Sequence, residues 1–345
     1  MTAKRWFPNR PFCDGGWQYM EQVRIGVIGT GRMGQNHCRV FSNMRHAKFV
    51  GVCDVNGDLG KEIARKYEVS YFRDVDSLIE NVDAVSICTP TPQHYELVMR
   101  CLDRNVHVMV EKPFTETLEQ ARALKEAAES KRKLVVQVGH IEKFNPTFIE
   151  LRKVLEGMTI LAMNFNRLSP FQGSNVDVDV VLDLMIHDIG LVVDLFEAEP
   201  ISMDAYGLSV FSDTIDHGLA VLRYDPGLLV SLTASRVTEQ KVRGINVTSK
   251  EAYIEADLLN KNISVHRRTL GDYVNHKNSG VKYRQESLIE RIVVPAMEPL
   301  FLELQDFVNC VIENKTPQVT AADGYNALRF VLLLRDKILE TMKVQ

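Results

Sequence analysis

Three side chains in the sequence have the types that the oxidation of an alcohol requires. Lys112 stands in "EKPFTET", directly after the apolar run "VHVMV", and Asp183 and His187 stand four residues apart in "VLDLMIHDIG". A hydride leaves a carbinol carbon when a base removes the hydroxyl proton and a cation stabilises the developing alkoxide. The histidine and the lysine suit these two roles. The four-residue spacing places Asp183 on the same helical face as His187, where its carboxylate would orient the imidazole or help to hold a substrate.

The same spacing also occurs where a histidine and an aspartate satisfy each other inside a protein core. Only apolar residues separate Asp183 from His187, so both polar groups would lack partners unless they met a ligand or each other. For the isolated pair, the structural interpretation is the more common one. The chemical interpretation becomes stronger because Lys112 accompanies the pair on a nucleotide-binding scaffold.

That scaffold is indicated by "GVIGTGRMGQNH", a G-x-G-x-x-G motif between a strand-like run and a helix. Such glycines allow a tight turn, a close approach of the backbone to a pyrophosphate, and close packing of helix against strand. Asp54 ends the next strand-like run, where a carboxylate accepts hydrogen bonds from the adenosine ribose and repels a 2′-phosphate, so we expect NAD rather than NADP. On a purely structural interpretation the glycines only form a turn and Asp54 caps a helix. The loop residues expected to contact the cofactor are Gly29, Thr30, Gly31, Arg32, Met33 and Gly34.

A second cofactor segment is predicted at "CTPTPQH". Its two prolines hold an extended loop at the carboxyl edge of the sheet, where the nicotinamide half of the cofactor would lie. We expect Thr89, Pro90 and His94 to line the nicotinamide ribose, although an isolated proline-rich turn would be unremarkable. Glu111 would hold a ribose hydroxyl or pair with Lys112.

The elements that must position these residues fall into two patterns. Short β-branched runs at 23–28, 48–54, 84–89, 106–111 and 134–139 alternate with amphipathic helical segments such as 116–132. This alternation predicts a Rossmann-type α/β fold, with a doubly wound parallel sheet.

The second pattern begins after a helical segment at 145–157. One apolar helix at 179–196 is followed by strand-like runs separated by Gly, Asp, Asn or Pro turns, and two helices close the chain. This pattern predicts an α+β domain with a largely antiparallel open sheet. The expected division is an extension at 1–22, an NAD-binding domain at 23–143, a substrate and oligomerisation domain at 144–320, and a C-terminal helix at 321–345 that packs back on the first domain. The strand-like runs are 201–210, 216–224, 227–236, 242–249, 252–258 and 262–268.

Composition excludes several classes of function. The 345 residues carry a net charge of −4 with no basic stripe, which argues against a nucleic-acid partner. No apolar run reaches the roughly 18 residues of a membrane span, and the first 22 residues lack the apolar segment of a signal peptide. The six cysteines include no CxxC pair, which suits reduced thiols in the cytoplasm. We expect no metal ion.

Taken in order, "GVIGTGRMGQNH", "CTPTPQH", "EKP" and "DLMIHD" resemble the motifs of the Gfo/Idh/MocA oxidoreductases, from Val23 to Lys343. The resemblance implies that Lys112 assists proton removal and polarises the substrate oxygen, that His187 is the general acid/base, and that Asp183 is its neighbour. It also implies a cis peptide before Pro113 and a homodimer or homotetramer formed through the second sheet.

Within this family, "GHIEKFNP", "RLSPF" and "ASRVTEQKVR" resemble the branch that oxidises the 3-hydroxyl of UDP-N-acetylglucosamine. In that branch a pyridoxal-phosphate aminotransferase uses the 3-keto sugar to make a diamino sugar for lipid A or other surface glycans. A diphosphate needs cations, although each basic residue taken singly is more often a solvated surface charge. Asn145 is equally suited to cap the next helix, whereas Asp177 and Asp179 are better interpreted as helix caps. The candidates for substrate contact are Lys112, His140, Lys143, Asn145, Arg167, Asp183, His187 and Arg236, with Arg243 as a further cation.

Two other functions remain open from the sequence. A dehydrogenase of myo-inositol or another free polyol would use the same lysine, aspartate and histidine without a diphosphate clamp. A non-catalytic NAD-binding sensor would have no need of Lys112, Asp183 and His187.

Overall fold

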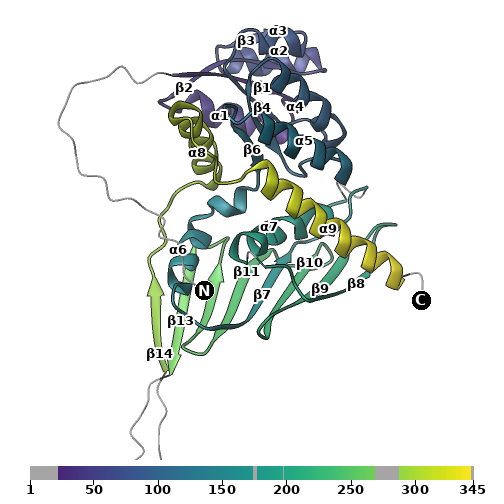
Figure 1. Ribbon diagram of the computed structural model, residues 1–345, viewed down its shortest axis with the longest axis vertical. Helices are drawn as coiled ribbons and strands as arrows, with labels where there is room; N and C mark the ends of the chain where they lie inside the picture. Colours follow the sequence, from purple (N-terminus) through teal and green to yellow (C-terminus); the bar gives the residue numbers. More distant parts are fainter. Residues whose placement is uncertain (1–21, 174–176, 197, 269–286, 343–345) are drawn as a thin grey trace, which may run out of the picture.

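The computed structural model describes residues 22–173, 177–196, 198–268 and 287–342, so nearly all of the expected extension at 1–22 lies outside the described residues. A parallel sheet with helices on both faces lies at one end of the molecule, and a broader sheet lies at the other (Figure 1). The helices between the two sheets are α6 (Pro146–Leu155), α7 (Ile186–Leu195) and α9 (Ala321–Met342). The expected fold class is confirmed.

The first sheet has the strand order β3-β2-β1-β4-β5-β6, and its described pairings are parallel. β1 pairs with both β2 and β4, so the order of strands reverses beside β1. In open α/β sheets this reversal creates the crevice in which ligands bind. The strands are β1 (Val23–Ile28), β2 (Ala47–Cys53), β3 (Ser70–Phe72), β4 (Ala84–Ile87), β5 (His107–Glu111) and β6 (Val136–Gly139).

The crossover helices of this sheet begin at polar caps. Thr117 and Gln120 form a reciprocal capping box at the start of α5, and Asn56 and Asp74 cap α2 and α3. The helices are α1 (Arg32–Ser42), α2 (Gly57–Lys66), α3 (Val75–Ile79), α4 (His94–Asp103) and α5 (Leu118–Ser130), with the short 3₁₀ turn η1 (Thr91–Gln93) before α4.

One segment differs from the expected division of domains. Helix α8 (Pro299–Glu313), which the sequence placed in the second domain, packs on α1 and β1 (Figure 1). Its buried residues Leu304 and Phe307 join the core that contains Ile25 and Phe41. The chain therefore returns to the first domain before the last helix, because the apolar face of α8 covers this side of the parallel sheet.

The second sheet has the order β14-β13-β12-β11-β7-β10-β9-β8. Its described pairings are antiparallel except β7 with β10, which is parallel. β7 was not expected, although Met163 and Phe165 point into the core and Asn164 lies between them, as in a half-buried strand. The strands are β7 (Ile160–Leu168), β8 (Ser202–Leu208), β9 (His217–Tyr224), β10 (Leu228–Ser235), β11 (Val242–Ser249), β12 (Tyr253–Asp257), β13 (Asn262–Arg268) and β14 (Ser287–Ile292).

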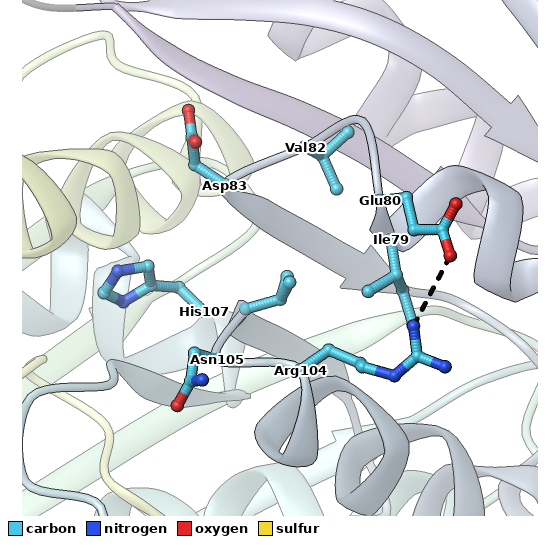
Figure 2. A pocket seen from close by; sticks show the side chains of 8 residues that line it. Ile79, Glu80, Val82, Asp83, Arg104, Asn105 and His107 are labelled. Carbon is cyan, nitrogen blue, oxygen red and sulfur yellow. Dashed lines mark ion pairs between the residues drawn. The ribbon is translucent and has the colours of Figure 1, made fainter.

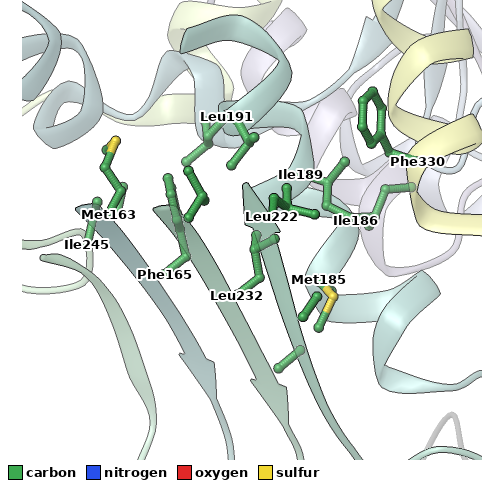
Figure 3. Packing of buried hydrophobic residues seen from close by; sticks show 14 of the residues in the cluster. Met163, Phe165, Met185, Ile186, Ile189, Leu191, Leu222, Leu232, Ile245 and Phe330 are labelled. Carbon is green, nitrogen blue, oxygen red and sulfur yellow. The ribbon is translucent and has the colours of Figure 1, made fainter. Parts of the chain in front are cut away.

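Helices cover one face of this sheet. The expected helix at 179–196 begins with the π-helical turn η3 (Val181–Met185) and continues as α7 (Ile186–Leu195), and the Asp179 carboxylate accepts the amides of Val181 and Leu182. Ile186, Ile189 and Leu191 pack against Phe165, Leu222 and Leu232 of the strands (Figure 3). This core fixes the start of α7, and with it His187, over the sheet.

The remaining helices join the two domains. The turn η2 (Ile141–Phe144) and helix α6 (Pro146–Leu155) follow β6. The long helix α9 (Ala321–Met342) contacts α5 and β6 of the first domain as well as α7 and β8 of the second. It therefore packs on both domains rather than on the first alone. No described helix is long and apolar enough to cross a membrane.

Candidate active site

The glycine-rich loop has the shape that a dinucleotide requires. Gly29 adopts φ +88°, and a Cβ on Gly34 would overlap the carbonyl oxygen of Gly29, so neither position accepts a larger residue without rearrangement. A Cβ on Gly31 would meet nothing within 4 Å. The structure therefore needs glycine at the first and third positions for its own packing, whereas Gly31 leaves open space where a pyrophosphate could approach the backbone.

Asp54 lies one residue beyond β2, where the ribose carboxylate of such folds is found. Its Oδ2 accepts the amide of Thr30 at 2.6 Å and the Thr30 hydroxyl at 2.7 Å, and its Oδ1 accepts the amide of Asn56. The carboxylate thereby joins the glycine-rich loop to the end of β2. Arg32 is exposed at the start of α1 and Met33 is half-buried beside it. These residues fit the adenosine half of NAD.

The segment after β4 carries two polar side chains, Thr89 and His94, that differ in whether the protein already satisfies their hydrogen bonds. The Thr89 hydroxyl is buried and has no hydrogen-bond partner among the residues that the structure describes, so it is available to a ligand. Pro90 is exposed before η1. We expected His94 to reach the nicotinamide ribose, and in this structure its ring nitrogens lie 2.9 Å from the carbonyl oxygens of Pro113 and Thr89. His94 instead holds the loop against the residue that follows Lys112.

Glu111 is held by a histidine that was not among the expected site residues. Its Oε1 lies 3.0 Å from His37 Nε2, its Oε2 accepts the amide of Lys112, and His37 Nδ1 lies 2.7 Å from the Ser86 hydroxyl. Although burial favours the neutral forms of both groups, Cys88 and Glu111 raise the pKa of His37, and His37 lowers the pKa of Glu111. The result is a buried ion pair directly before Lys112. The expected pairing of Glu111 with the Lys112 ammonium does not form.

A second carboxyl lies in the same region without a partner. Glu303 of α8 is fully buried, and neither of its carboxylate oxygens accepts a hydrogen bond from the described residues. Burial, followed by the charge of Glu111, raises its pKa well above the usual value. Burial therefore favours the protonated form of Glu303. Nothing in the sequence distinguished Glu303, which stands between Leu302 and Leu304, from a solvent-exposed carboxyl of the helix.

Lys112 and Asp183 bring the two domains together. The Lys112 ammonium donates to the main-chain oxygen of Asp183 at 2.8 Å and to its Oδ1 at 3.2 Å. The peptide between Lys112 and Pro113 is cis. The expected contact between Asp183 and His187 is absent from the structure, because the Asp183 carboxylate pairs with the lysine. An ammonium thus lies at the end of β5, opposite the π-turn that precedes His187.

His187 is a neutral imidazole in a cationic setting. Its Nδ1 is buried and has no hydrogen-bond partner in the described part of the chain. Burial, followed by the charges of Lys112, Arg167 and Arg243, lowers its pKa well below the usual value. His140 lies nearby after β6, and burial lowers its pKa to about 3, with Lys143 adding to the effect. An unprotonated imidazole beside an ammonium can accept a proton from an alcohol while the cation stabilises the alkoxide.

Several expected substrate ligands have structural partners instead. Lys143 is buried between the carboxylates of Asp194 and Asp323, at 3.4 and 3.5 Å. The Asn145 side chain accepts the amide of Thr147 and caps α6, so of its two expected roles the structure contains the cap. These contacts join η2 to α7 and α9.

Two of the expected arginines are likewise engaged. Arg167 is fully buried and donates to both oxygens of Asp188 and to Glu142 at 2.6–2.9 Å. Arg236 donates to Asp216 and to the main-chain oxygen of Val178. We expected both to bind substrate, and in this structure they donate to carboxylates from other elements that the sequence does not place beside them.

The residues that the structure describes contain no group of three or more His, Cys, Asp or Glu side chains placed to hold a metal ion. A hollow of about 360 Å³ lies elsewhere, between the segments that precede β4 and β5, and it is lined by Asp83, Arg104 and His107 among others (Figure 2). Because these residues lie before the strands or at their first residue, the hollow is at the amino edge of the sheet, away from Lys112 and the glycine-rich loop.

Comparison with known proteins agrees with this geometry. Residues 23–140 match a family model described as the oxidoreductase family with an NAD-binding Rossmann fold, and residues 167–255 match the GFO/IDH/MocA C-terminal domain. The UDP-N-acetylglucosamine 3-dehydrogenase of Acidithiobacillus ferrooxidans is 32% identical over 92% of this chain and 97% of its own. The scyllo-inositol 2-dehydrogenase (NAD(+)) of Bacillus subtilis is 26% identical over 94% and 96%.

Solved structures show the same fold. A structure of the Acidithiobacillus ferrooxidans enzyme has a TM-score of 0.83 and 29% identity, covering 92% of this chain and 98% of that one. The scyllo-inositol dehydrogenase of Lactobacillus casei with bound NAD(H) and scyllo-inositol has a TM-score of 0.75 at 20% identity, covering 93% and 98%, and shows likeness of fold alone. The chain thus belongs to the Gfo/Idh/MocA family and is an NAD-dependent oxidoreductase acting on a CH–OH group.

Proposed function

We propose that the protein oxidises the 3-hydroxyl of the sugar in UDP-N-acetylglucosamine and yields the 3-keto nucleotide sugar. The observation that carries this proposal is the approach of Lys112 to Asp183 beside the neutral His187, at the junction of the two domains. The relative that acts on this substrate is also similar over nearly the full length of both chains.

The proposed roles follow from the charges of these groups. Bound NAD supplies the acceptor for the hydride that leaves the carbinol carbon. His187 takes the hydroxyl proton, since its pKa is low enough to keep the imidazole unprotonated at neutral pH. The Lys112 ammonium stabilises the developing alkoxide, and Asp183 holds the ammonium in place. Thr89 and Glu111 line the nicotinamide ribose, and Asp54 accepts from the adenosine ribose.

An inositol or related polyol dehydrogenase is the second candidate. It is favoured by relatives from Bacillus subtilis and Thermotoga maritima, named as scyllo- and myo-inositol dehydrogenases, at 26% and 28% identity. The same lysine, aspartate and histidine would serve a free polyol.

The test follows NADH formation by the full-length protein with NAD and either UDP-N-acetylglucosamine, myo-inositol or scyllo-inositol. A 2-keto acid or an aminotransferase is added in parallel to draw off an unfavourable equilibrium. Turnover with the nucleotide sugar alone, with a product two hydrogens lighter, supports the proposal. Turnover with an inositol alone assigns the second function. If the protein binds NAD but turns over none of the three substrates, the remaining function is that of a non-catalytic NAD-binding sensor.

We further propose that the ketone passes to a pyridoxal-phosphate aminotransferase, for a diamino sugar of lipid A or another surface glycan. The five described cysteines are free thiols, which suits the cytoplasm. Adding the aminotransferase should convert the ketone to an amine in the presence of an amino donor. Cell fractionation that found the protein outside the cytoplasm would contradict the location.

We also propose a homodimer or homotetramer formed through the face of the second sheet that the described helices leave uncovered. On this face β8, β9 and β10 expose Tyr206, Leu219, Val221 and Leu229. An apolar patch of this kind is usually covered by a partner. Val221→Glu should shift the mass measured by sedimentation toward the monomer, whereas a wild-type protein that is already monomeric would refute the proposal.

A further inference from the structure

Three arginines gather at one end of the second sheet, on the face that the helices cover. In the strand register Arg243 of β11 lies directly opposite Arg167 of β7, and Arg236 follows the end of β10. Arg243 shares the alternation of the buried residues Ile245 and Val247, so it belongs to the same face as they do. This face also carries α7 and His187.

Arg243 differs from its neighbours in having no partner for its guanidinium. Arg167 donates to Glu142 and Asp188, and Arg236 donates to Asp216. The Arg243 guanidinium has no hydrogen-bond or ion-pair partner in the part of the chain that the structure describes, and its Nη1 is buried. A buried donor without an acceptor is costly and therefore uncommon in folded proteins.

The surroundings indicate what the missing partner is. Arg243 is close enough to His187 for its charge to lower the pKa of that imidazole, and its own pKa is lowered by burial and by Arg167. The carboxylates whose charges act on Arg243 are Glu142, Asp188 and Asp183, and they already accept from Arg167 or Lys112. A guanidinium presents paired donors that match a phosphate or a carboxylate, so an incoming anion would satisfy it.

We propose that Arg243 binds an anionic group of the substrate, either a phosphate of the nucleotide diphosphate or a carboxylate on the sugar, and so selects charged sugars over neutral polyols. This inference rests on the proposed function, because it specifies the substrate class of the same site. Arg243 is a specificity residue and takes no part in proton transfer.

The test measures ligand binding to the full-length protein by calorimetry, without need of turnover. The ligands are UDP, UDP-glucose, UDP-glucuronate and myo-inositol, and the proteins are wild type, Arg243→Gln, Arg243→Lys and Arg132→Gln. Arg132 is an exposed arginine after α5, at the amino edge of the parallel sheet, so Arg132→Gln is a matched control for the loss of charge. NAD affinity reports whether each variant is folded.

Loss of a charged hydrogen-bonded contact should weaken binding about 10- to 100-fold in Arg243→Gln, with a smaller loss in Arg243→Lys. If a phosphate is the partner, UDP and both nucleotide sugars weaken together, whereas only UDP-glucuronate weakens if the partner is the sugar carboxylate. Wild-type affinity for all ligands in Arg243→Gln overturns the inference, as does a wild-type protein that binds myo-inositol and none of the anions. Tight UDP binding that depends on Arg243, without turnover of UDP-N-acetylglucosamine, sustains the inference while refuting the proposed substrate.

Discussion

The Nζ atom of Lys112 donates to both the main-chain oxygen and the Oδ1 of Asp183, at 2.8 and 3.2 Å. The lysine directly follows β5 of the nucleotide-binding domain, and the aspartate lies in the π-turn before α7 of the second domain. One side chain therefore spans the junction between the two domains. Its ammonium lies where an alkoxide could form next to a neutral imidazole.

Lys112→Met is expected to lower kcat by roughly 10²- to 10⁴-fold, because it removes the cation that stabilises the alkoxide. NAD affinity should change little, since the glycine-rich loop and Asp54 are untouched. Steady-state kinetics together with NAD titration monitor the two effects. A rate near that of the wild type would rule out the proposed role of the lysine.

The two glycine positions of the loop should respond differently to alanine. Gly34→Ala should destabilise the fold, because its Cβ would overlap the Gly29 carbonyl oxygen. Gly31→Ala has open space in the protein and should keep the wild-type melting temperature while losing NAD affinity by an order of magnitude or more. Thermal melts and NAD titrations of both variants test this contrast. Unchanged NAD affinity in Gly31→Ala would place the pyrophosphate elsewhere.

Asp54→Asn should weaken NAD binding much more than NADP binding. The carboxylate accepts hydrogen bonds from the adenosine ribose and repels a 2′-phosphate. A neutral amide accepts more weakly and does not repel the phosphate. The ratio of the two dissociation constants is the measurement, so a general loss of stability from the broken Thr30 contacts cancels. An equal loss for both cofactors would contradict a ribose contact.

The depressed pKa of His187 predicts the acid limb of the pH profile. Because the folded enzyme keeps this imidazole neutral well below its usual pKa of about 6.5, kcat/KM should remain constant as the pH falls through that value and should drop only at lower pH. Arg243→Gln removes one of the charges that lower the pKa and should move the limb upward. An acid limb at about pH 6.5 in both proteins would contradict this electrostatic account.

Burial of His140 predicts a loss of stability in acid. The pKa of His140 is about 3 in the folded protein and about 6.5 in the unfolded chain. Its contribution to the free energy of unfolding is therefore fully present above pH 6.5 and is lost as the pH falls toward 3. Between pH 6.5 and pH 5 the loss is about 2 kcal/mol. The free energy of unfolding of His140→Gln, measured by urea titration, should therefore depend less on pH over this range. The same dependence in both proteins would show that His140 is not the group responsible.

Sequence patterns were sufficient for the local elements and insufficient for the contacts between them. The strand, turn and helix around Gly29 and Gly34 follow from the spacing of the glycines, and Asp54 follows from the end of the next strand. The pairing of Lys112 with Asp183 could not be predicted, because the two residues are 71 positions apart and lie in different domains. The helical spacing instead suggested that Asp183 would face His187.

The arginines illustrate the same limit. Arg167 has the residue type of a phosphate ligand, yet Asp188 and Glu142 neutralise it from α7 and η2. The sequence did not favour Arg243 over Arg167 or Arg236 as a ligand for the substrate. Among these three described arginines, Arg243 has a buried nitrogen, Nη1, without a hydrogen-bond partner in the described residues. His37 escaped notice because a histidine on the buried face of α1 resembles any core histidine until Glu111 is placed beside it.

The central claim is that the enzyme removes a hydride from the carbon that bears the sugar 3-hydroxyl. The most direct test supplies UDP-N-acetylglucosamine carrying deuterium at that carbon, with NAD, and measures the label in the NADH by mass spectrometry. We predict NADH that carries one deuterium and an unlabelled keto sugar. Unlabelled NADH, or no reduction of NAD in the presence of an aminotransferase, would contradict the claim.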